Sequence, residues 1–232
     1  MIKPSVVAIV PAAGIGRRFG GSVRKTFVEL KGIPLLVHTL SRLSEVASIS
    51  DIIPVLRADD IETGRKLFAQ YKIEKVRQIV AGGAERQDSI NNAVKLIEGD
   101  CIVLIHDGAR PIISEKLVAN LLENLEGVDG VIPGLPVKET LKQVDGNGMV
   151  VSTVDREKFR SIQTPQAFTS GVIKRAYKMA YADGFYGTDD AALVERAGGR
   201  VKIIPGDHFN IKITTQEDLE LAEMLIERRS HL

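Results

Sequence analysis

The chain has 232 residues, of which 44% are hydrophobic and 26% are charged, as in ordinary soluble globular proteins. Its 31 basic and 30 acidic side chains give a net charge of +1, which argues against nucleic acid and anionic membranes as partners. Cys101 is the single cysteine, so a disulfide within the chain and a cysteine zinc site are both excluded.

Length and hydropathy limit the class of protein further. At about 150 residues per domain the chain does not require two domains, and we expect residues 1–232 to form one. No apolar run approaches the roughly 18 residues of a membrane-spanning helix, and the first residues show no signal-peptide pattern. We therefore expect a cytoplasmic protein.

The first predicted strand, residues 6–10, leads directly into a loop of small residues and cations. Pro11 lacks a backbone donor and should end the strand pairing. Small side chains allow a ligand to lie against the main chain. The small residues are Ala12, Ala13, Gly14 and Gly16, and the cations that follow are Arg17, Arg18, Arg24 and Lys25. This combination favours a polyphosphate ligand.

Three interpretations of this loop compete. A plain strand–loop–helix turn would use its glycines only for tight packing. A dinucleotide-binding fingerprint would need a third glycine where Phe19 stands, and a P-loop would end in Gly-Lys-Ser or Gly-Lys-Thr, which is absent here. The density of cations favours the third interpretation, a nucleoside-triphosphate loop of the nucleotidyltransferase type.

Beyond this loop, predicted helices and strands alternate through the first half of the chain. The predicted helices are 35–46, 59–71 and 85–97, and the predicted strands are 52–56, 76–80 and 101–106. Such alternation indicates parallel βαβ units, so we expect an α/β, Rossmann-like and mostly parallel sheet flanked by helices. Ligands bind such sheets at the carboxyl ends of the strands. The loops 11–25, 81–89 and 107–111 should therefore share one site.

The alternation ends in the second half, after a predicted strand at 128–133. Residues 137–144 and 149–154 flank the tetrad Asp-Gly-Asn-Gly, a pattern typical of a β-hairpin. We expect residues 136–160 to form an arm that projects from the sheet. Because an isolated hairpin is marginally stable in water, the arm should pack on a second subunit and form a homodimer. The alternative is a hairpin folded back on its own domain.

The last third of the chain is predicted to hold a loop, three helices and one strand. The loop is 164–166, and the strand is 201–205. The helices are 170–182 with Ser170 as N-cap, 191–197 after two acidic capping residues, and 217–229 with Thr214 and Glu217 as a capping box.

Two further constellations suggest chemistry. Asp107 follows a buried strand, where a carboxylate can bind a Mg²⁺–phosphate unit or a ribose hydroxyl. Its alternative roles are to cap the helix that begins near Ser114 or to pair with Arg110. Gly82 and Gly83 could expose backbone groups to a base, although a plain turn would have the same sequence. Ser89 could reach a phosphate from the following helix.

Five motifs, spread over essentially the whole chain, resemble those of the 2-C-methyl-D-erythritol 4-phosphate cytidylyltransferases. They are Pro11-Ala-Ala-Gly-Ile-Gly-Arg-Arg with Arg24-Lys25, Gly82-Gly-Ala-Glu-Arg-Gln-Asp-Ser89, His106-Asp-Gly-Ala-Arg-Pro111, Thr164-Pro-Gln166 and Asn210-Ile-Lys-Ile-Thr214. The resemblance implies a fold of the nucleotide-diphospho-sugar transferase type, with an arm that interlocks two subunits. It also implies transfer of a cytidylyl group from CTP to a sugar-alcohol phosphate, with Mg²⁺ and release of pyrophosphate.

The resemblance also implies roles for individual residues. Arg18 and Lys25 would stabilise charge on the triphosphate, and Arg156 and Lys212 would position the acceptor phosphate. The nucleotide-binding positions would be Ala12, Ala13, Gly14, Gly16, Gly82, Gly83, Ser89 and Asp107. The acceptor-binding positions would be Arg110, Thr140 and Thr164, with Thr140 and Arg156 reached from the partner's arm. Asp107 would be the candidate magnesium ligand, directly or through water or phosphate. Some members of the family carry an acidic residue where this chain has Phe209, and Asp207 lies two positions earlier.

Two alternatives remain open at this point. The first and third motifs are shared with the ribitol 5-phosphate cytidylyltransferases, whose acceptor differs by a methyl branch and one carbon. A non-catalytic nucleotide-binding regulatory module would not need the Arg156 and Lys212 end of the site. A phosphate nucleophile is already ionised at pH 7, so catalysis would need alignment and charge neutralisation rather than a strong base.

Overall fold

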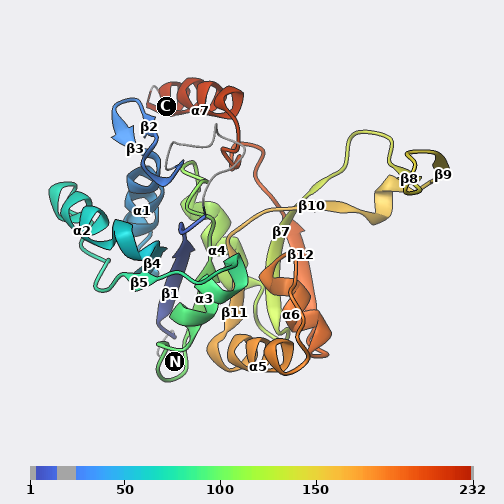
Figure 1. Cartoon of the computed structure of the whole chain (residues 1–232), viewed down its shortest axis with the longest axis horizontal. Helices are drawn as coiled ribbons and strands as arrows, with labels where there is room; N and C mark the ends of the chain where they lie inside the picture. Colours follow the sequence, from blue (N-terminus) through green and yellow to red (C-terminus); the bar gives the residue numbers. More distant parts are fainter. Residues whose placement is uncertain (1–3, 15–24, 231–232) are drawn as a thin grey trace.

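The computed structural model describes residues 4–14 and 25–230, and within them eight strands form one sheet (Figure 1). β7 has β12 on one side. On its other side the order of the strands is β11, β6, β1, β4 and β5. The strands are β1 (Val6–Pro11), β4 (Ile49–Leu56), β5 (Val80–Ala81), β6 (Ile102–Ile105), β7 (Gly130–Pro136), β10 (Arg160–Ile162), β11 (Gln166–Thr169) and β12 (Val201–Pro205). The expected α/β architecture is confirmed.

The order of the strands reverses between β1 and β6. β1 is parallel to both of these neighbours, β4 on one side and β6 on the other. The chain moves outward from β1 to β4 and β5, and then returns to place β6 on the opposite side of β1. Loops at the carboxyl ends of β1 and β6 therefore diverge and leave a crevice, the usual ligand site of such sheets.

Strand β11 was not predicted from the sequence and lies antiparallel between β6 and β7. Its first residue, Gln166, falls in the segment expected to be a loop. Ile162 of β10 pairs with Gly134, and Ala167 of β11 pairs with Val131. Residues 163–166 thus lie opposite only residues 132–133, so two extra residues bulge out where β10 passes into β11. This bulge contains Thr164 and Pro165, and it faces the end of β6.

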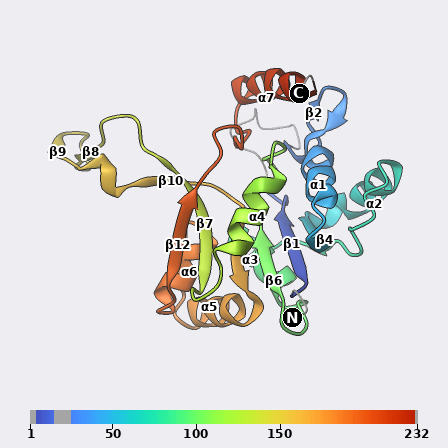
Figure 2. The ribbon, with the colours of Figure 1, turned by 180° about the vertical axis from the view of Figure 1, so that it is seen from behind.

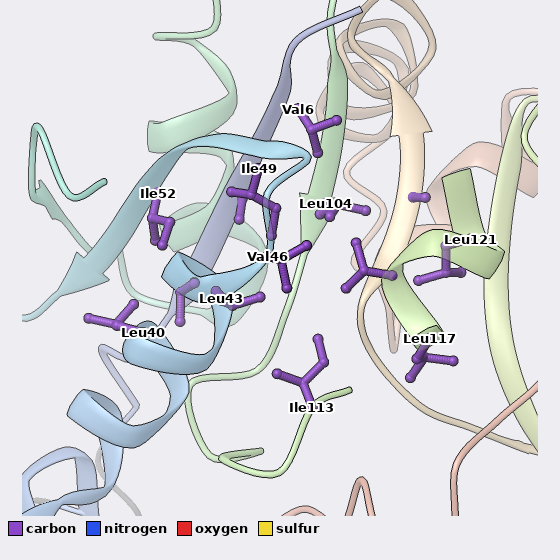
Figure 3. Close-up of a cluster of buried hydrophobic side chains, with 14 of the residues drawn as sticks. Val6, Leu40, Leu43, Val46, Ile49, Ile52, Leu104, Ile113, Leu117 and Leu121 are labelled. Carbon is purple, nitrogen blue, oxygen red and sulfur yellow. The ribbon is translucent and has the colours of Figure 1, made fainter. Parts of the chain in front are cut away.

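Helices cover both faces of the sheet (Figure 2). They are α1 (Leu35–Glu45), α2 (Ile61–Gln70), α3 (Arg86–Val94), α4 (Glu115–Glu123), α5 (Ser170–Ala182), α6 (Asp190–Arg196) and α7 (Gln216–Ser230). Side chains alternate between the faces along β1, so that Ala8 and Val10 pack with α1 and α4 while Ile9 packs with α3 and α5. Two separate cores result, and Figure 3 shows the first of them. Among the described helices, none is long and apolar enough to cross a membrane.

Leu104 lies at the centre of the first core and is fully buried. Leu104→Ala should lower the free energy of unfolding by about 2–5 kcal/mol, because it removes buried surface and leaves a cavity. Leu96→Ala is the matched control, since Leu96 is 47% exposed, and it should change stability by less than about 0.5 kcal/mol. Urea unfolding of both variants would measure the difference, and equal losses would contradict this account of the core.

Three predictions of the local structure need correction. The strand expected at 76–80 is reduced to β5, and Val76 makes only an isolated bridge to Ile52. Thr169 rather than Ser170 is the N-cap of α5, because the Ser170 hydroxyl donates to the carbonyl of Gly99. The cap of α7 is formed by Thr215 and Asp218, not by Thr214 and Glu217: the Asp218 carboxylate accepts from the backbone N–H groups of residues 214 and 215.

Helix α7 packs against a small hairpin near residue 30 rather than against the main sheet. A third, smaller core joins α7 to the hairpin of β2 (Glu29–Leu30) and β3 (Ile33–Pro34). Its buried members are Leu30, Leu35, Ile112, Ile213, Leu219 and Ala222. Because Ile213 belongs to this core, the segment before α7 is held beside the carboxyl end of β6.

The hairpin arm projects from the body of the molecule (Figures 1 and 2). It consists of β8 (Lys142–Val144) and β9 (Val150–Thr153), which pair antiparallel with each other. The base of the arm belongs to the main sheet, since β10 pairs with the end of β7. Toward the tip, Val144, Met149, Val150 and Val151 are between 54% and 68% exposed.

Candidate active site

A cavity of about 570 Å³ opens at the carboxyl ends of β1 and β6. It is lined by Pro11, Ala12, Ala13, Gly14, Thr26, Leu35, Gly83, Ala84, Glu85, Arg86, Ser89, Asp107, Gly108, Ala109, Lys212 and Thr214. This lining includes described residues from all three loops that we expected to share one site. The loop at 57–60, which reads as an ordinary helix start, contributes no residue to this lining.

Close backbone packing forms one wall of the cavity. A Cβ atom on Gly82 would lie 2.4 Å from the Cβ of Ala13, so only glycine allows these two loops to meet. The Gly83 N–H donates to the Ser89 hydroxyl at 3.0 Å. Ser89 is 4% exposed, and its hydroxyl therefore holds the glycine loop against α3 while it lines the cavity.

Asp107 is the centre of the charged wall. Its Oδ2 lies 2.9 Å from Lys212 Nζ and 3.4 Å from Arg110 Nε, and its Oδ1 lies 3.8 Å from Arg86 Nε. Burial alone would raise the pKa of Asp107, but Lys212, Arg86 and Arg110 outweigh it and hold the pKa far below its usual range. The carboxylate is therefore ionised at neutral pH. Its single negative charge is surrounded by the three positive charges of Lys212, Arg86 and Arg110. Such a wall suits an anionic ligand.

His106 and Thr164 fix the backbone of Asp107. The Asp107 N–H donates to Thr164 Oγ1 at 3.0 Å, and Thr164 Oγ1 lies 3.1 Å from His106 Nδ1. His106 Nε2 lies 3.1 Å from the carbonyl of Arg110. Because a carbonyl can only accept, the proton belongs on Nε2, and Nδ1 accepts from the Thr164 hydroxyl. The bulge between β10 and β11 thus supplies the hydroxyl that orients the loop after β6.

His106 should make stability depend on pH. It is fully buried, and burial is the main influence that lowers its pKa from 6.5 to about 4. The unfolded chain binds a proton more readily than the folded one, so stability is complete above pH 6.5 and is lost as the pH falls toward 4. Wild type should lose about 2 kcal/mol from this residue between pH 7.5 and pH 5.

The variant His106→Gln tests this source of pH dependence. Glutamine keeps polar groups at the position but does not titrate, so the part of the pH slope that comes from residue 106 should vanish. Urea unfolding at pH 7.5 and pH 5 would give the slopes of the two proteins. Equal slopes would show that the imidazole does not carry this pH dependence.

Arg110 holds the segment before α7 in place. It is 8% exposed, and its Nη1 donates to the carbonyl of Asn210 at 2.7 Å. Asn210 is fully buried, and its Nδ2 donates to the carbonyl of Thr164 at 2.7 Å. These bonds join the β6 loop, the bulge and the 210–214 segment, and they place Lys212 over Asp107. Arg110 and Thr164, predicted as acceptor contacts, are both engaged in hydrogen bonds within the wall.

The remaining predicted residues are distributed unevenly. Gly16 and Arg18 lie outside the described residues, and Lys25 begins the short 3-10 helix η2 (Lys25–Phe27). The next residue, Thr26, lines the cavity, and its hydroxyl donates to the carbonyl of Ala12 at 2.8 Å. Thr140 and Arg156 are exposed on the arm and do not line the cavity of their own chain. Asp207 does not line it either, and its carboxylate accepts from the N–H of Phe209.

Arg86 is the site residue that the sequence interpretation did not single out. It lines the cavity, and its side chain is 34% exposed. The sequence did contain a signal for Arg86, namely a cation inside the glycine-rich segment 82–89. The same combination of glycines and cations had indicated a ligand site in the first loop. The acidic partner of Arg86, Asp190, was interpreted only as part of a helix cap.

Comparisons with known proteins agree over nearly the whole chain. The family model described as 2-C-methyl-D-erythritol 4-phosphate cytidylyltransferase matches residues 6–228. A relative of that name from Syntrophus aciditrophicus is 44% identical and covers 98% of both chains. Another from Geobacter metallireducens is 42% identical and covers 97% of this chain and 99% of its own.

Solved structures agree with the sequence relatives. The 4-diphosphocytidyl-2C-methyl-D-erythritol synthase of Anaerococcus prevotii superposes with a TM-score of 0.85 at 33% identity, covering 97% of this chain and 96% of its own. The cytidylyltransferase of Thermus thermophilus gives 0.77 at 31% identity, with 94% and 98% covered. The chain belongs to the 2-C-methyl-D-erythritol 4-phosphate cytidylyltransferase family.

Proposed function

We propose that this chain transfers the cytidylyl group of CTP to 2-C-methyl-D-erythritol 4-phosphate in the cytoplasm, where nucleoside triphosphates are made. The products are CDP-methylerythritol and pyrophosphate. The observation that carries the proposal is the meeting, in one cavity, of a glycine-walled surface with Asp107 and two of its cations, Arg86 and Lys212. The family membership supports the choice of both substrates.

In the proposed reaction, an oxygen of the acceptor phosphate attacks the α-phosphorus of CTP. The new bond joins that oxygen to the α-phosphorus, and the bond from the α-phosphorus to the oxygen bridging to the β-phosphorus breaks. The electron pair leaves with pyrophosphate. Because the second pKa of a phosphate monoester is about 6, the nucleophile is ionised at pH 7. The protein needs to align two anions and to neutralise the charge that moves onto the leaving group.

The site residues divide between the two substrates. We assign the nucleoside to the small-residue surface, and the triphosphate to the cations Arg18 and Lys25. Lys212 is assigned to the acceptor phosphate, since it is 39% exposed on the cavity wall beside Asp107. The assigned nucleotide positions are Ala12, Ala13, Gly14, Gly16, Gly82, Gly83, Ser89 and Asp107. The assigned acceptor positions are Arg110, Thr140 and Thr164, of which Arg110 and Thr164 act by shaping the wall.

Mg²⁺ is the proposed cofactor, and Asp107 is the residue that would hold it. No group of three or more acidic, histidine or cysteine residues gathers within the described part of the chain. One carboxylate fits Mg²⁺ because this ion keeps several waters and takes its remaining ligands from substrate phosphates. The low pKa of Asp107 keeps that oxygen ligand charged. When bound, Mg²⁺ would neutralise triphosphate charge.

We also propose that residues 1–232 form one domain and that residues 136–160 act as a dimerisation arm. The exposed valines of β9 would be covered by a second subunit, which solvated hairpins of this size need for stability. Arg156 lies in the 3-10 helix η4 (Arg156–Lys158), which follows β9, and Thr140 lies in the segment that joins β7 to β8. In the dimer these two residues would reach the partner's cavity.

Pyrophosphate release from the purified protein tests the proposed function. CTP and Mg²⁺ are supplied with methylerythritol phosphate or with ribitol 5-phosphate in parallel. Release with the first alone is the expected result. A preference for ribitol 5-phosphate would keep the mechanism and change the acceptor. Absence of release with either, under conditions where calorimetry shows CTP binding, would favour a non-catalytic nucleotide-binding module.

A further inference from the structure

Asp190 is a buried carboxylate that does not cap its own helix. It is the first residue of α6 and is 1% exposed. The capping role belongs to its neighbour Asp189, whose Oδ1 accepts from the N–H of Ala192 at 2.9 Å. The Asp190 carboxylate accepts instead from Tyr177 Oη at 2.6 Å and from Arg86 Nη2 at 2.7 Å. Both partners come from other helices.

Arg86 connects this buried carboxylate to the active site. Its Nη2 is bonded to Asp190, its Nε lies 3.8 Å from Asp107 Oδ1, and its side chain is one-third exposed on the cavity wall. Burial would lower the pKa of Arg86, but the two carboxylates outweigh this effect and raise it. The guanidinium is therefore a permanent cation, held at a defined place in the wall.

The position of Arg86 relative to Asp107 indicates which substrate it meets. Lys212 and Arg110 approach Oδ2 of Asp107, whereas Arg86 approaches Oδ1. Arg86 also lies between Gly83 and Ser89, two positions that we assign to the nucleotide. Arg86 thus lies at the nucleotide end of the cluster around Asp107. Lys212, the cation proposed for the acceptor phosphate, lies beside the other carboxylate oxygen.

The buried ion pair between Arg86 and Asp190 is not an efficient way to hold α3 and α6 together. Desolvating two charges costs free energy that an apolar pair of similar size does not cost. An arginine side chain, however, loses rotamer freedom when it is fixed, which costs free energy. An anchor that fixes it before substrate binds removes that cost from the reaction. Tyr177, which is 1% exposed, fixes the anchor in turn.

We infer that Arg86 is a further substrate-contacting cation at the nucleotide end of the site and that Asp190, held by Tyr177, is the positioning residue that orients it. This inference rests on the proposed function, because it assigns Arg86 to the CTP that the function requires. Asp190 itself does not touch substrate.

The variant Asp190→Asn tests the inference. An asparagine keeps an oxygen for Tyr177 but turns an N–H toward Arg86, so the guanidinium loses its anchor. We expect kcat/KM for CTP to fall about 10- to 100-fold, the usual effect of misplacing a group by about 1 Å. The KM for the acceptor should change less than about threefold, and Asp190→Glu should restore part of the loss because it returns a charge to the position.

A double-mutant cycle separates positioning from a general structural role. In an Arg86→Gln background, Asp190→Asn should lower kcat/KM by less than about twofold, because the group on which it acts is already gone. Asp189→Asn is the matched control, one residue away with no contact to Arg86, and it should stay within about threefold of wild type. Thermal unfolding of each variant fixes a temperature at which all are folded.

The outcomes distinguish this inference from the function on which it rests. Equal losses from Asp190→Asn with and without Arg86 would overturn the positioning role, as would an Asp189→Asn variant that is equally impaired. If wild type itself releases no pyrophosphate, the proposed function fails. Calorimetric binding of CTP to the same four proteins of the cycle then still reports whether Arg86 and Asp190 are coupled.

Discussion

Lys212→Gln is expected to lower kcat/KM by about 100- to 1000-fold, the cost of removing one preorganised charge donor from a transfer site. Lys212 Nζ lies 2.9 Å from the ionised Asp107 carboxylate, and its side chain is partly exposed on the cavity wall. Glutamine retains the polarity and most of the length of the side chain but removes the charge. Initial rates with varied acceptor would show the loss.

Lys202→Gln is the matched control for this experiment. Lys202 lies on β12, is exposed, and bonds to Asn124 rather than to the cavity. Its loss should leave kcat/KM within about twofold, as for ordinary surface substitutions. A Lys212→Gln variant that is as active as this control would remove Lys212 from the catalytic set and would contradict the assignment of the acceptor phosphate.

If the arm forms the proposed dimer, replacing both Val150 and Val151 by Asp should yield a monomer and lower activity by about 100-fold or more. Both valines are at least 60% exposed on the arm, so the isolated chain loses little stability, whereas four charges cannot be buried in an apolar interface. Activity should fall because, in the proposed dimer, each site would lose the cationic Arg156 of the partner's arm. Light scattering and initial rates measure the two effects, and Leu96→Asp provides a control charge at an exposed site outside the arm.

Subunit mixing tests whether the arm acts in the partner's site. Arg156→Gln and Lys212→Gln should each be nearly inactive alone. In a heterodimer, the Arg156→Gln chain keeps Lys212 and receives the intact arm of its partner, so one of the two sites is complete. After co-refolding in equal amounts, half of the dimers are heterodimers, and about one quarter of wild-type activity should return. No recovery, or an active monomer, would show that the arm does not complete a neighbouring site.

Much of the fold could be predicted because its signals are local. The sequence of β1 is a β-branched run, which predicts a strand buried on both faces. The helices show periodic apolar residues, which predict burial of one face. Chain order also placed three loops at one end of the sheet. Strand β11 could not be found in this way, because it has four residues, follows a proline and gains its strand character from pairing with β6 and β7.

The roles of individual polar residues depended on contacts distant in sequence. Thr164 and Arg110 were predicted as acceptor positions from motifs alone, which could not show that one also orients the Asp107 loop and the other holds the carbonyl of Asn210. Asp190 looked like part of a cap until its bond to Arg86, 104 residues away, became visible. Motifs predicted which segments meet, whereas only the packing showed which side chains turn into the cavity.

The most direct test of the account is the fate of oxygen-18 placed on the acceptor phosphate. Methylerythritol phosphate labelled on its non-ester phosphate oxygens is turned over with CTP and Mg²⁺, and phosphorus NMR follows the isotope shifts. If the acceptor phosphate attacks the α-phosphorus, the bridging oxygen of the CDP product carries label and the released pyrophosphate carries none. Label in pyrophosphate, or an unlabelled bridge, would contradict the mechanism proposed for the Asp107-centred site.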